Sequence, residues 1–204
     1  MKYTPLPKEM YQRNRAKFAT KMAKNGVAIF NANDILPTNA DGTMKFRQNN
    51  DLFYLCGIDQ EETILLLAPD CPNPAWREVL FLRETNDHIA VWEGHKYTKE
   101  EAFAASGIEN IQWLSSFDSI FNSVVNLAER IYLNSNEHLR AGVVVETRDA
   151  RFIKTCKEKY PLHIVERAAP IMHELRGVKE PEEIQQLQVD CDITEKGFRR
   201  VLGM

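Results

Sequence analysis

The chain has 204 residues, of which 44% are hydrophobic and 27% charged, as expected of a globular protein with one domain and an appendage, or with two small domains. Its 26 Lys and Arg against 29 Asp and Glu give a net charge of -3, so bulk charge provides no electrostatic footprint for nucleic acid. The chain opens without the apolar core of a signal peptide, and no apolar run approaches membrane-spanning length. We therefore expect a cytoplasmic protein with neither a nucleic-acid nor a membrane partner.

The first half of the chain is predicted to hold one helix and a series of short strands. The helix spans 8–24 and ends at Asn25-Gly26, a good helix-stop pair. A polar stretch with an Asp41-Gly42 turn signal separates the first strand from the second. The predicted strands are 27–30, 52–56, 63–68, 78–82 and 89–92. Ile64 to Leu67 has no polar alternation, which predicts a strand buried on both faces.

The second half is predicted to alternate between helices and strands. The clearest helix spans 117–129, with Ser116 as its N-cap and apolar residues on one face. Further helices are expected at 99–105, at 147–159 and from Pro181 onward, and strands at 111–114, 131–133 and 162–165. Strands interleaved with helices indicate an α/β fold with a central mixed β-sheet flanked by helices, plus a C-terminal helix.

The four cysteines show no C-x-x-C spacing. Two of them lie in segments with apolar periodicity. We therefore expect reduced, mostly buried thiols, as is usual in a cytoplasmic protein. The four are Cys56, Cys71, Cys156 and Cys191.

The last predicted helix carries an apolar stripe that has two interpretations. Its members recur at spacings of three, four or seven: Ile184, Leu187, Cys191, Phe198, Val201 and Leu202. Such a helix either folds back on its own domain or opens a second domain. Composition does not choose between these alternatives.

Three motifs in this chain resemble those of aminopeptidase P, a member of the creatinase and prolidase superfamily. The segment Arg47–Gly57, with Asp51 and Tyr54, resembles R-Q-x-S-D-F-x-Y-L-T-G of its amino-terminal domain; Asn50 and Cys56 replace Ser and Thr. Ile89–Gly94 is similar to E-I-W-x-G. His173–Ile184, which includes Arg176, resembles the junction H-E-M-R…K-S-P-E-E-I that leads into the catalytic "pita-bread" domain.

This resemblance implies a division of the chain and a function. Residues 1–177 would form the amino-terminal domain, whose sheet resembles a ribonuclease H-like core, and 178–204 a linker and the first helix of the catalytic domain. The chain would be the non-catalytic part of an Xaa-Pro aminopeptidase, which removes an N-terminal residue preceding proline. It would shape substrate access and oligomer contacts. The N-terminal domain of a prolidase and a stand-alone interaction or regulatory protein are the alternatives.

The resemblance also implies the parent's cofactor and partners. Two divalent metal ions, expected to be manganese, would lie in the catalytic domain. The partners would be that domain, further copies in a homodimer or tetramer, and peptides with proline at the second position. Trp92 and Asp41 match residues near the cleft mouth of a neighbouring subunit, whereas from size alone Trp92 would cap a core edge.

The residues themselves supply no catalytic or metal-binding constellation. The five histidines form neither H-x-H nor H-E-x-x-H, and His173-Glu174 is not completed because position 177 is Gly, so His173 is better interpreted as a surface or junction residue. G-x-S-x-G and glycine-rich phosphate loops are also missing. On the first helix, Arg13, Lys17, Lys21 and Lys24 form a basic stripe, for which a solvated face is favoured over an anion-binding surface.

Overall fold

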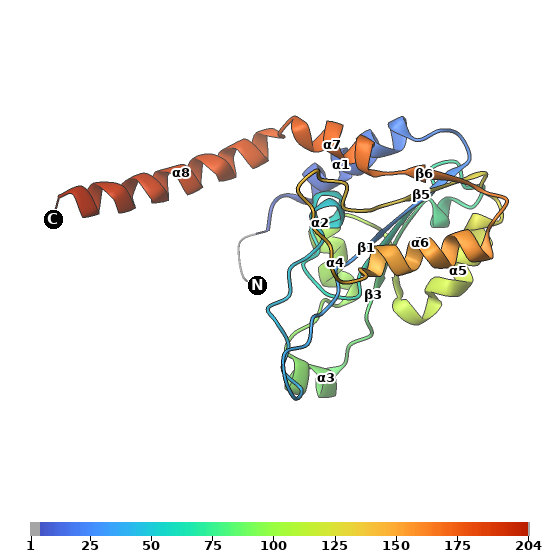
Figure 1. Ribbon diagram of the computed structural model, residues 1–204, viewed down its shortest axis with the longest axis horizontal. Coiled ribbons are helices and arrows are strands. Elements are labelled where there is room, and N and C mark those ends of the chain that lie inside the picture. The colour runs from blue at the N-terminus through green and yellow to red at the C-terminus, as the bar shows by residue number, and fades with distance from the viewer. Residues whose placement is uncertain (1–4, 204) are drawn as a thin grey trace.

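A computed structural model describes residues 5–203, apart from the side chain of Asp87. The outer limits of the predicted domains, residues 1 and 204, lie outside the described residues. A six-stranded sheet has helices on both faces, and one long helix extends away from this body (Figure 1). The predicted α/β class, with a mixed sheet and a C-terminal helix, is confirmed.

The described elements alternate along the chain. The strands are β1 (Gly26–Asn31), β2 (Ile64–Leu67), β3 (Glu78–Leu82), β4 (Asn110–Trp113), β5 (Arg130–Leu133) and β6 (Ile164–Arg167). The helices are α1 (Lys8–Lys21), α2 (Asn50–Cys56), α3 (Asp87–Glu93), α4 (Lys99–Ser106), α5 (Phe117–Val125), α6 (Arg148–Lys159), α7 (Ala169–Gly177) and α8 (Pro181–Leu202). Short 3-10 turns lie at Pro74–Trp76 and Leu114–Ser116.

The strands lie in the order β4-β3-β2-β1-β5-β6. β2 is antiparallel to both of its neighbours, and the remaining pairs are parallel. The register places Ile29 of β1 opposite Leu66 of β2 and Leu133 of β5. The two reversals around β2 make the sheet mixed.

The central strands β1, β2 and β3 are buried on both faces of the sheet, because successive residues of a strand point to opposite sides. Ala28 and Phe30 of β1 join the core beneath α1, α2, α4 and α7. Val27 and Ile29 join the other core, beneath α5 and α6. β2 divides its side chains in the same way, which confirms that it is buried on both faces.

The predicted aromatic strand at 52–56 is wrong, because this segment is helix α2. The Asn49 side chain accepts hydrogen bonds from the backbone N–H groups of Asp51 and Leu52, which caps the helix. Gly57 ends the helix in the left-handed conformation, with φ of 71°. The capping signals at the two ends of this helix therefore outweigh the β-propensity of its four aromatic and aliphatic residues.

The predicted strand at 89–92 is also wrong, because these residues lie in the exposed helix α3. Asn86 caps it by accepting a hydrogen bond from the backbone N–H of Ile89. Helix α7 was not predicted at all. Ser116 occupies the N-cap position of α5, as predicted, but it also ends a 3-10 turn and its side chain makes no capping hydrogen bond. α1 and α5 end three to four residues before their predicted ends, at Lys21 and Val125.

The other expected elements are confirmed within a few residues of their predicted bounds. The four cysteines are free, and three of them are buried, whereas Cys191 is exposed on α8. Within residues 5–203, no helix combines the length and the apolar character that crossing a membrane requires.

Candidate functional site

Two sequence motifs separated by about 120 residues meet where α2 packs against α7. Arg176 Nη1 lies 2.8 Å from Asp51 Oδ1, and the second carboxylate oxygen of Asp51 accepts a hydrogen bond from Asn134 at 3.2 Å. The Tyr54 hydroxyl donates to the backbone carbonyl of Leu175 at 3.4 Å. Burial raises the pKa of Tyr54 to about 12, so this hydroxyl keeps its proton at neutral pH. These contacts fix α7 to the core.

Gly57 allows α2 to approach α1 closely. A Cβ atom at this position would lie 2.5 Å from the Tyr11 ring, and the left-handed backbone disfavours any side chain. Tyr11 itself is buried, which raises the pKa of its hydroxyl well above its ordinary value. Gly57 is therefore required by both the turn and the packing of Tyr11.

Two further motif residues, Arg47 and His173, lie at the surface, whereas a third, Gln48, is buried. Arg47 is exposed, and its backbone carbonyl accepts a hydrogen bond from Asn33. His173 is exposed on α7 and is not brought together with Asp51 and Arg176 by any hydrogen bond among the described residues. Gln48 has a structural role, because its buried amide donates hydrogen bonds to the backbone carbonyls of Ile58 and Gln60.

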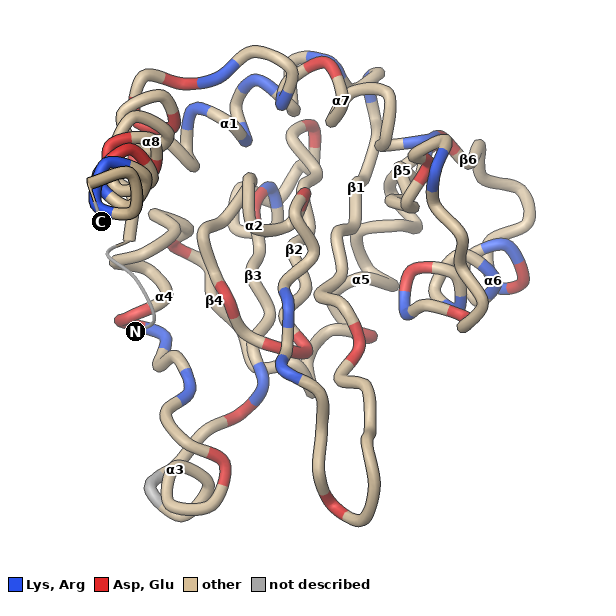
Figure 2. Tube along the Cα trace, turned by 60° about the vertical axis from the view of Figure 1, so that its left-hand side comes forward, with Lys and Arg blue, Asp and Glu red and all other residues tan. Residues whose placement is uncertain are grey.

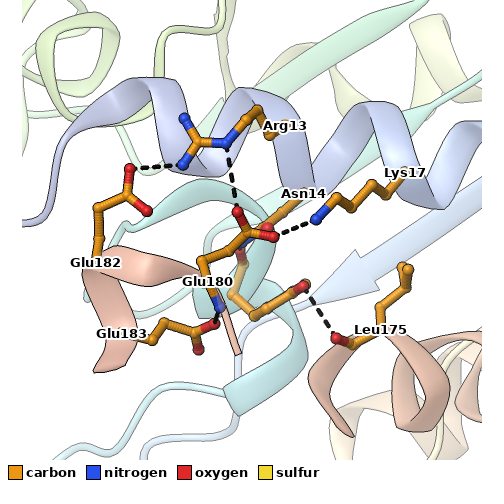
Figure 3. A network of polar contacts seen from close by, with 8 residues as sticks. Arg13, Asn14, Lys17, Leu175, Glu180, Glu182 and Glu183 are labelled. Carbon is orange, nitrogen blue, oxygen red and sulfur yellow. Dashed lines mark hydrogen bonds and ion pairs between the residues drawn. The ribbon is translucent and has the colours of Figure 1, made fainter. Parts of the chain in front are cut away.

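The basic stripe on α1 binds acidic residues of the chain itself (Figure 3). Arg13 contacts Glu182 at 2.6 Å and Glu180 at 3.4 Å, and Lys17 contacts the other oxygen of Glu180. Lys21 pairs with Glu174 of α7 at 2.7 Å, and Lys24 is exposed. Arg13 and Lys17 are exposed, as the favoured interpretation of a solvated face requires, and in addition they form ion pairs with the start of α8.

We call Arg13, Lys17, Glu180 and Glu182 the junction cluster. Glu180 is only 7% exposed, and its bonds to Lys17 and Arg13 hold its pKa below the ordinary value of a glutamate. It also precedes Pro181 as the N-cap of α8 and forms a capping box with Glu183, whose carboxylate accepts from the Glu180 backbone N–H at 2.8 Å. The sequence predicted a helix from Pro181 onward, but neither this capping pattern nor the basic partners on α1.

Beyond its first turn, α8 leaves the body of the molecule (Figure 1). Every residue from 184 to 203 is exposed, including the apolar stripe. The interpretation in which this helix folds back on its own domain is therefore wrong for this structure. A helix with an unburied apolar face is suited to packing against another protein surface.

A cavity of about 520 Å³ lies beside the carboxyl end of β1, between loop residues 32–49 and 142–149. Asp149, in the first turn of α6, lines it and accepts a hydrogen bond from Asn31 at 2.9 Å. Burial raises the pKa of Asp149 to about 6. A second cavity, of about 740 Å³, is lined by Tyr11, Phe46, Arg47, Phe53, Gln186 and Val189, among others, and so borders the start of α8.

Trp92 and Asp41 project from the body on separate segments. Trp92 is 79% exposed on α3, so the expectation that it caps a core edge is wrong. Asp41 is exposed in a loop closed by a hydrogen bond from the Thr38 N–H to the Gly42 carbonyl at 2.9 Å. Helix α3 and this loop lie at the same end of the molecule but apart from one another (Figure 2).

The described residues contain no group of three or more His, Cys, Asp or Glu side chains placed to hold a metal ion. Basic and acidic residues are interspersed along the trace (Figure 2). The most extensive polar arrangement described above is the junction cluster, which holds the start of α8 against α1.

Comparison with known proteins gives a family match. Residues 11–132 match the model of the aminopeptidase P N-terminal domain. The chain is 24% identical over 201 residues to Xaa-Pro aminopeptidase of Escherichia coli K12, covering 97% of this chain and 45% of that protein. It is 23% identical to human Xaa-Pro aminopeptidase 3, covering 75% of this chain and 30% of that protein. The chain thus spans less than half the length of these relatives.

A solved structure of Pseudomonas aeruginosa aminopeptidase PepP has a similar fold, with a TM-score of 0.71 and 21% sequence identity. The match covers 90% of this chain and 41% of that one.

Proposed function

Because this chain belongs to the aminopeptidase P N-terminal domain family, we propose that it is the non-catalytic amino-terminal part of an Xaa-Pro aminopeptidase. The parent enzyme would remove the N-terminal residue that precedes proline. The family match over residues 11–132 carries this proposal, and the names of the E. coli and human relatives support this substrate class. These names also favour an aminopeptidase over a prolidase as the parent.

The parent enzyme would use two metal ions, expected to be manganese, and the described residues of this chain do not provide the ligands to hold them. Its described residues offer no cluster of suitable ligands, so the chain would leave metal chemistry to another part of the enzyme. Its own contribution would be to shape the approach to that site. Residues 178–180 would act as a linker, and α8 as the first helix packed against the catalytic domain.

The exposed stripe of α8 supports this docking role. Ile184, Leu187 and Phe198 are each more than half exposed, and a catalytic domain would bury them. Trp92 and Asp41 would then contribute to the cleft mouth, in the same subunit or in a neighbouring copy of a dimer or tetramer. There Trp92 would form an apolar wall, and Asp41 would attract the positively charged end of an unblocked peptide. We place such an enzyme in the cytoplasm.

The reading frame that follows Met204 tests this proposal. A continuation that encodes two Asp, one His and two Glu residues as metal ligands, as the family resemblance implies, would support it. A stop codon directly after Met204 would contradict it. That outcome would favour the alternative of a stand-alone interaction protein, for which the exposed stripe of α8 would be the binding surface.

A further inference from the structure

We propose that Glu180 is a positioning residue: held by Lys17 and Arg13, it sets the direction in which α8 leaves the domain. This inference rests on the proposed function, because the direction matters if α8 carries the neighbouring domain. It concerns a role that the motif resemblance does not assign, since Ser occupies this place in the family motif.

Among the described residues, the polar contacts between α8 and the body lie at the start of the helix. Within the described residues, hydrogen bonds or ion pairs to α1 come from Glu180 and Glu182. From residue 184 onward the helix is exposed, although Gln186 and Val189 border a cavity. The orientation of a 22-residue helix thus depends on contacts at its base.

The length of α8 magnifies small changes at that base. A helix of this length extends for about 33 Å, so a tilt of about 10° would displace its far end by about 6 Å. A domain packed against α8 would move by a comparable amount relative to α3 and to the loop that contains Asp41. A displacement of this size would change the shape of a cleft between the two domains.

Glu180 is better suited than its neighbours to fix the tilt. Its two carboxylate oxygens bind two different residues of α1, Lys17 and Arg13, four positions apart and therefore one helical turn from each other (Figure 3). Two attachment points on one carboxylate resist rotation of the start of α8 relative to α1, whereas a single bond would allow it. Its burial also limits screening by salt, in contrast to the more exposed pair Lys21–Glu174.

Other contacts hold α7 in place before α8 begins. Asp51–Arg176 and Tyr54–Leu175 fix α7 to α2, and Lys21–Glu174 links it to α1. Three residues separate Gly177, the end of α7, from Pro181, the start of α8. Because α7 is already fixed to the body, the short connection from Gly177 to Pro181 starts from a fixed point. The junction cluster then fixes its other end, where α8 begins.

The direction of α8 can be measured in the purified chain by pulsed electron paramagnetic resonance. Cys191 is exposed on α8 and accepts one spin label, and Glu158→Cys provides a second site on the exposed face of α6. The remaining cysteines are buried, and burial raises the pKa of Cys56 to about 12 and of Cys156 to about 11, so their thiols resist labelling.

We expect a single main distance in the parent chain. Glu180→Gln keeps a side-chain oxygen that can cap α8 but removes the charge, and we expect the population outside the main distance to rise roughly ten-fold. Lys17→Gln, at a half-exposed position, should produce a smaller rise in the same direction without unfolding the chain. Lys24→Gln is the matched control, because it removes a basic charge next to α1 but outside the cluster.

Unchanged distances in both Glu180→Gln and Lys17→Gln would overturn the proposal, as would an equal broadening in Lys24→Gln or a broad distribution in the parent chain. Circular dichroism of each variant shows whether α8 remains helical. A distance distribution that broadens because α8 unfolds would count against the proposal. The measurement needs no catalytic domain. A failure of the proposed enzyme function is therefore distinguishable from a failure of this positioning role.

Discussion

At the residue scale, the functional motifs of this chain act mainly through packing. Asp51, Tyr54 and Gly57 join α2 to its neighbours instead of lining a catalytic centre. The family resemblance singled out these residues and Arg176 in two separate motifs. It could not indicate their contacts, because Asp51 and Arg176 are 125 positions apart and meet only in the folded chain.

Gly57→Ala tests the packing role of this glycine. The left-handed backbone alone disfavours Ala by about 1–2 kcal/mol, and the close approach of Tyr11 adds to this, so we expect a loss of about 2–4 kcal/mol in the free energy of unfolding. Urea denaturation measures the loss. Gly177→Ala is the control, since a Cβ there meets open space. Equal stability of Gly57→Ala and the parent would contradict the structural account of α2.

Asp149→Asn tests the buried carboxyl beside β1. Its folded pKa, about 6, is above the ordinary 3.8, so the folded state is penalised when this group ionises. The penalty is absent below about pH 4 and complete above about pH 6. The Asn variant keeps an oxygen for Asn31 and should be more stable than the parent at pH 7–8 by on the order of 1–3 kcal/mol.

Thermal unfolding at pH 4 and pH 8 measures this difference, and Asp190→Asn, at an exposed position on α8, is the control. The gain should disappear at pH 4. A gain that is the same at both pH values would show that ionisation of Asp149 is not its cause.

Trp92→Ala tests the assignment of this residue to the cleft mouth. In the full-length enzyme it should raise KM more than it lowers kcat, because an aromatic wall at the entrance contacts substrate without stabilising developing charge. Stability should barely change, since the side chain is exposed. Val91→Ala, equally exposed on α3, is the matched control. Unfolding of Trp92→Ala with intact kinetics in the surviving protein would mean that the tryptophan serves the fold.

At the element scale, segments with one clear apolar pattern were predictable, whereas short segments that mix aromatic and aliphatic residues were not. The helix stripe at Phe117, Phe121 and Val124 and the apolar run of β2 each determine one structure. Short aromatic segments such as Phe53-Tyr54-Leu55 fit either a strand or a helix, and the cap residues Asn49 and Gly57 decide the outcome. Helix α7, which was not predicted, carries comparable signals in its sequence, namely Pro170 in its first turn and apolar residues on its core face.

Hydrogen exchange tests the expected contrast between α5 and α8. Amides of α5 lie over the core and should exchange slowly. Those of α8 beyond about residue 184 should exchange faster than those of α5, because no tertiary packing opposes the local opening of a helix that is formed most of the time. Uniformly slow exchange through Leu202 in a proven monomer would mean that the stripe of α8 packs against its own domain in solution.

At the scale of the whole molecule, the structure consists of a complete α/β core and a helix whose apolar face is unburied. The two hydrophobic clusters bury both faces of the central strands of the sheet. Helix α8 is different, because its apolar residues are in contact with water. The sequence predicted an α/β core and an apolar stripe on the last helix, but it left open whether the stripe is buried. It also did not predict the direction of α8, which depends on ion pairs between residues more than 160 positions apart.

The most direct test of the central claim, that this chain is the non-catalytic part of an Xaa-Pro aminopeptidase, is a peptidase assay of purified residues 1–204. The chain is incubated with a peptide that has proline at its second position and with added manganese, and release of the N-terminal residue is measured. The full-length enzyme assayed in parallel is the positive control. Because the described residues provide no metal site, we predict no release above background by this chain. Release by residues 1–204 alone at about ten per second, a rate typical of enzymes, would contradict the account.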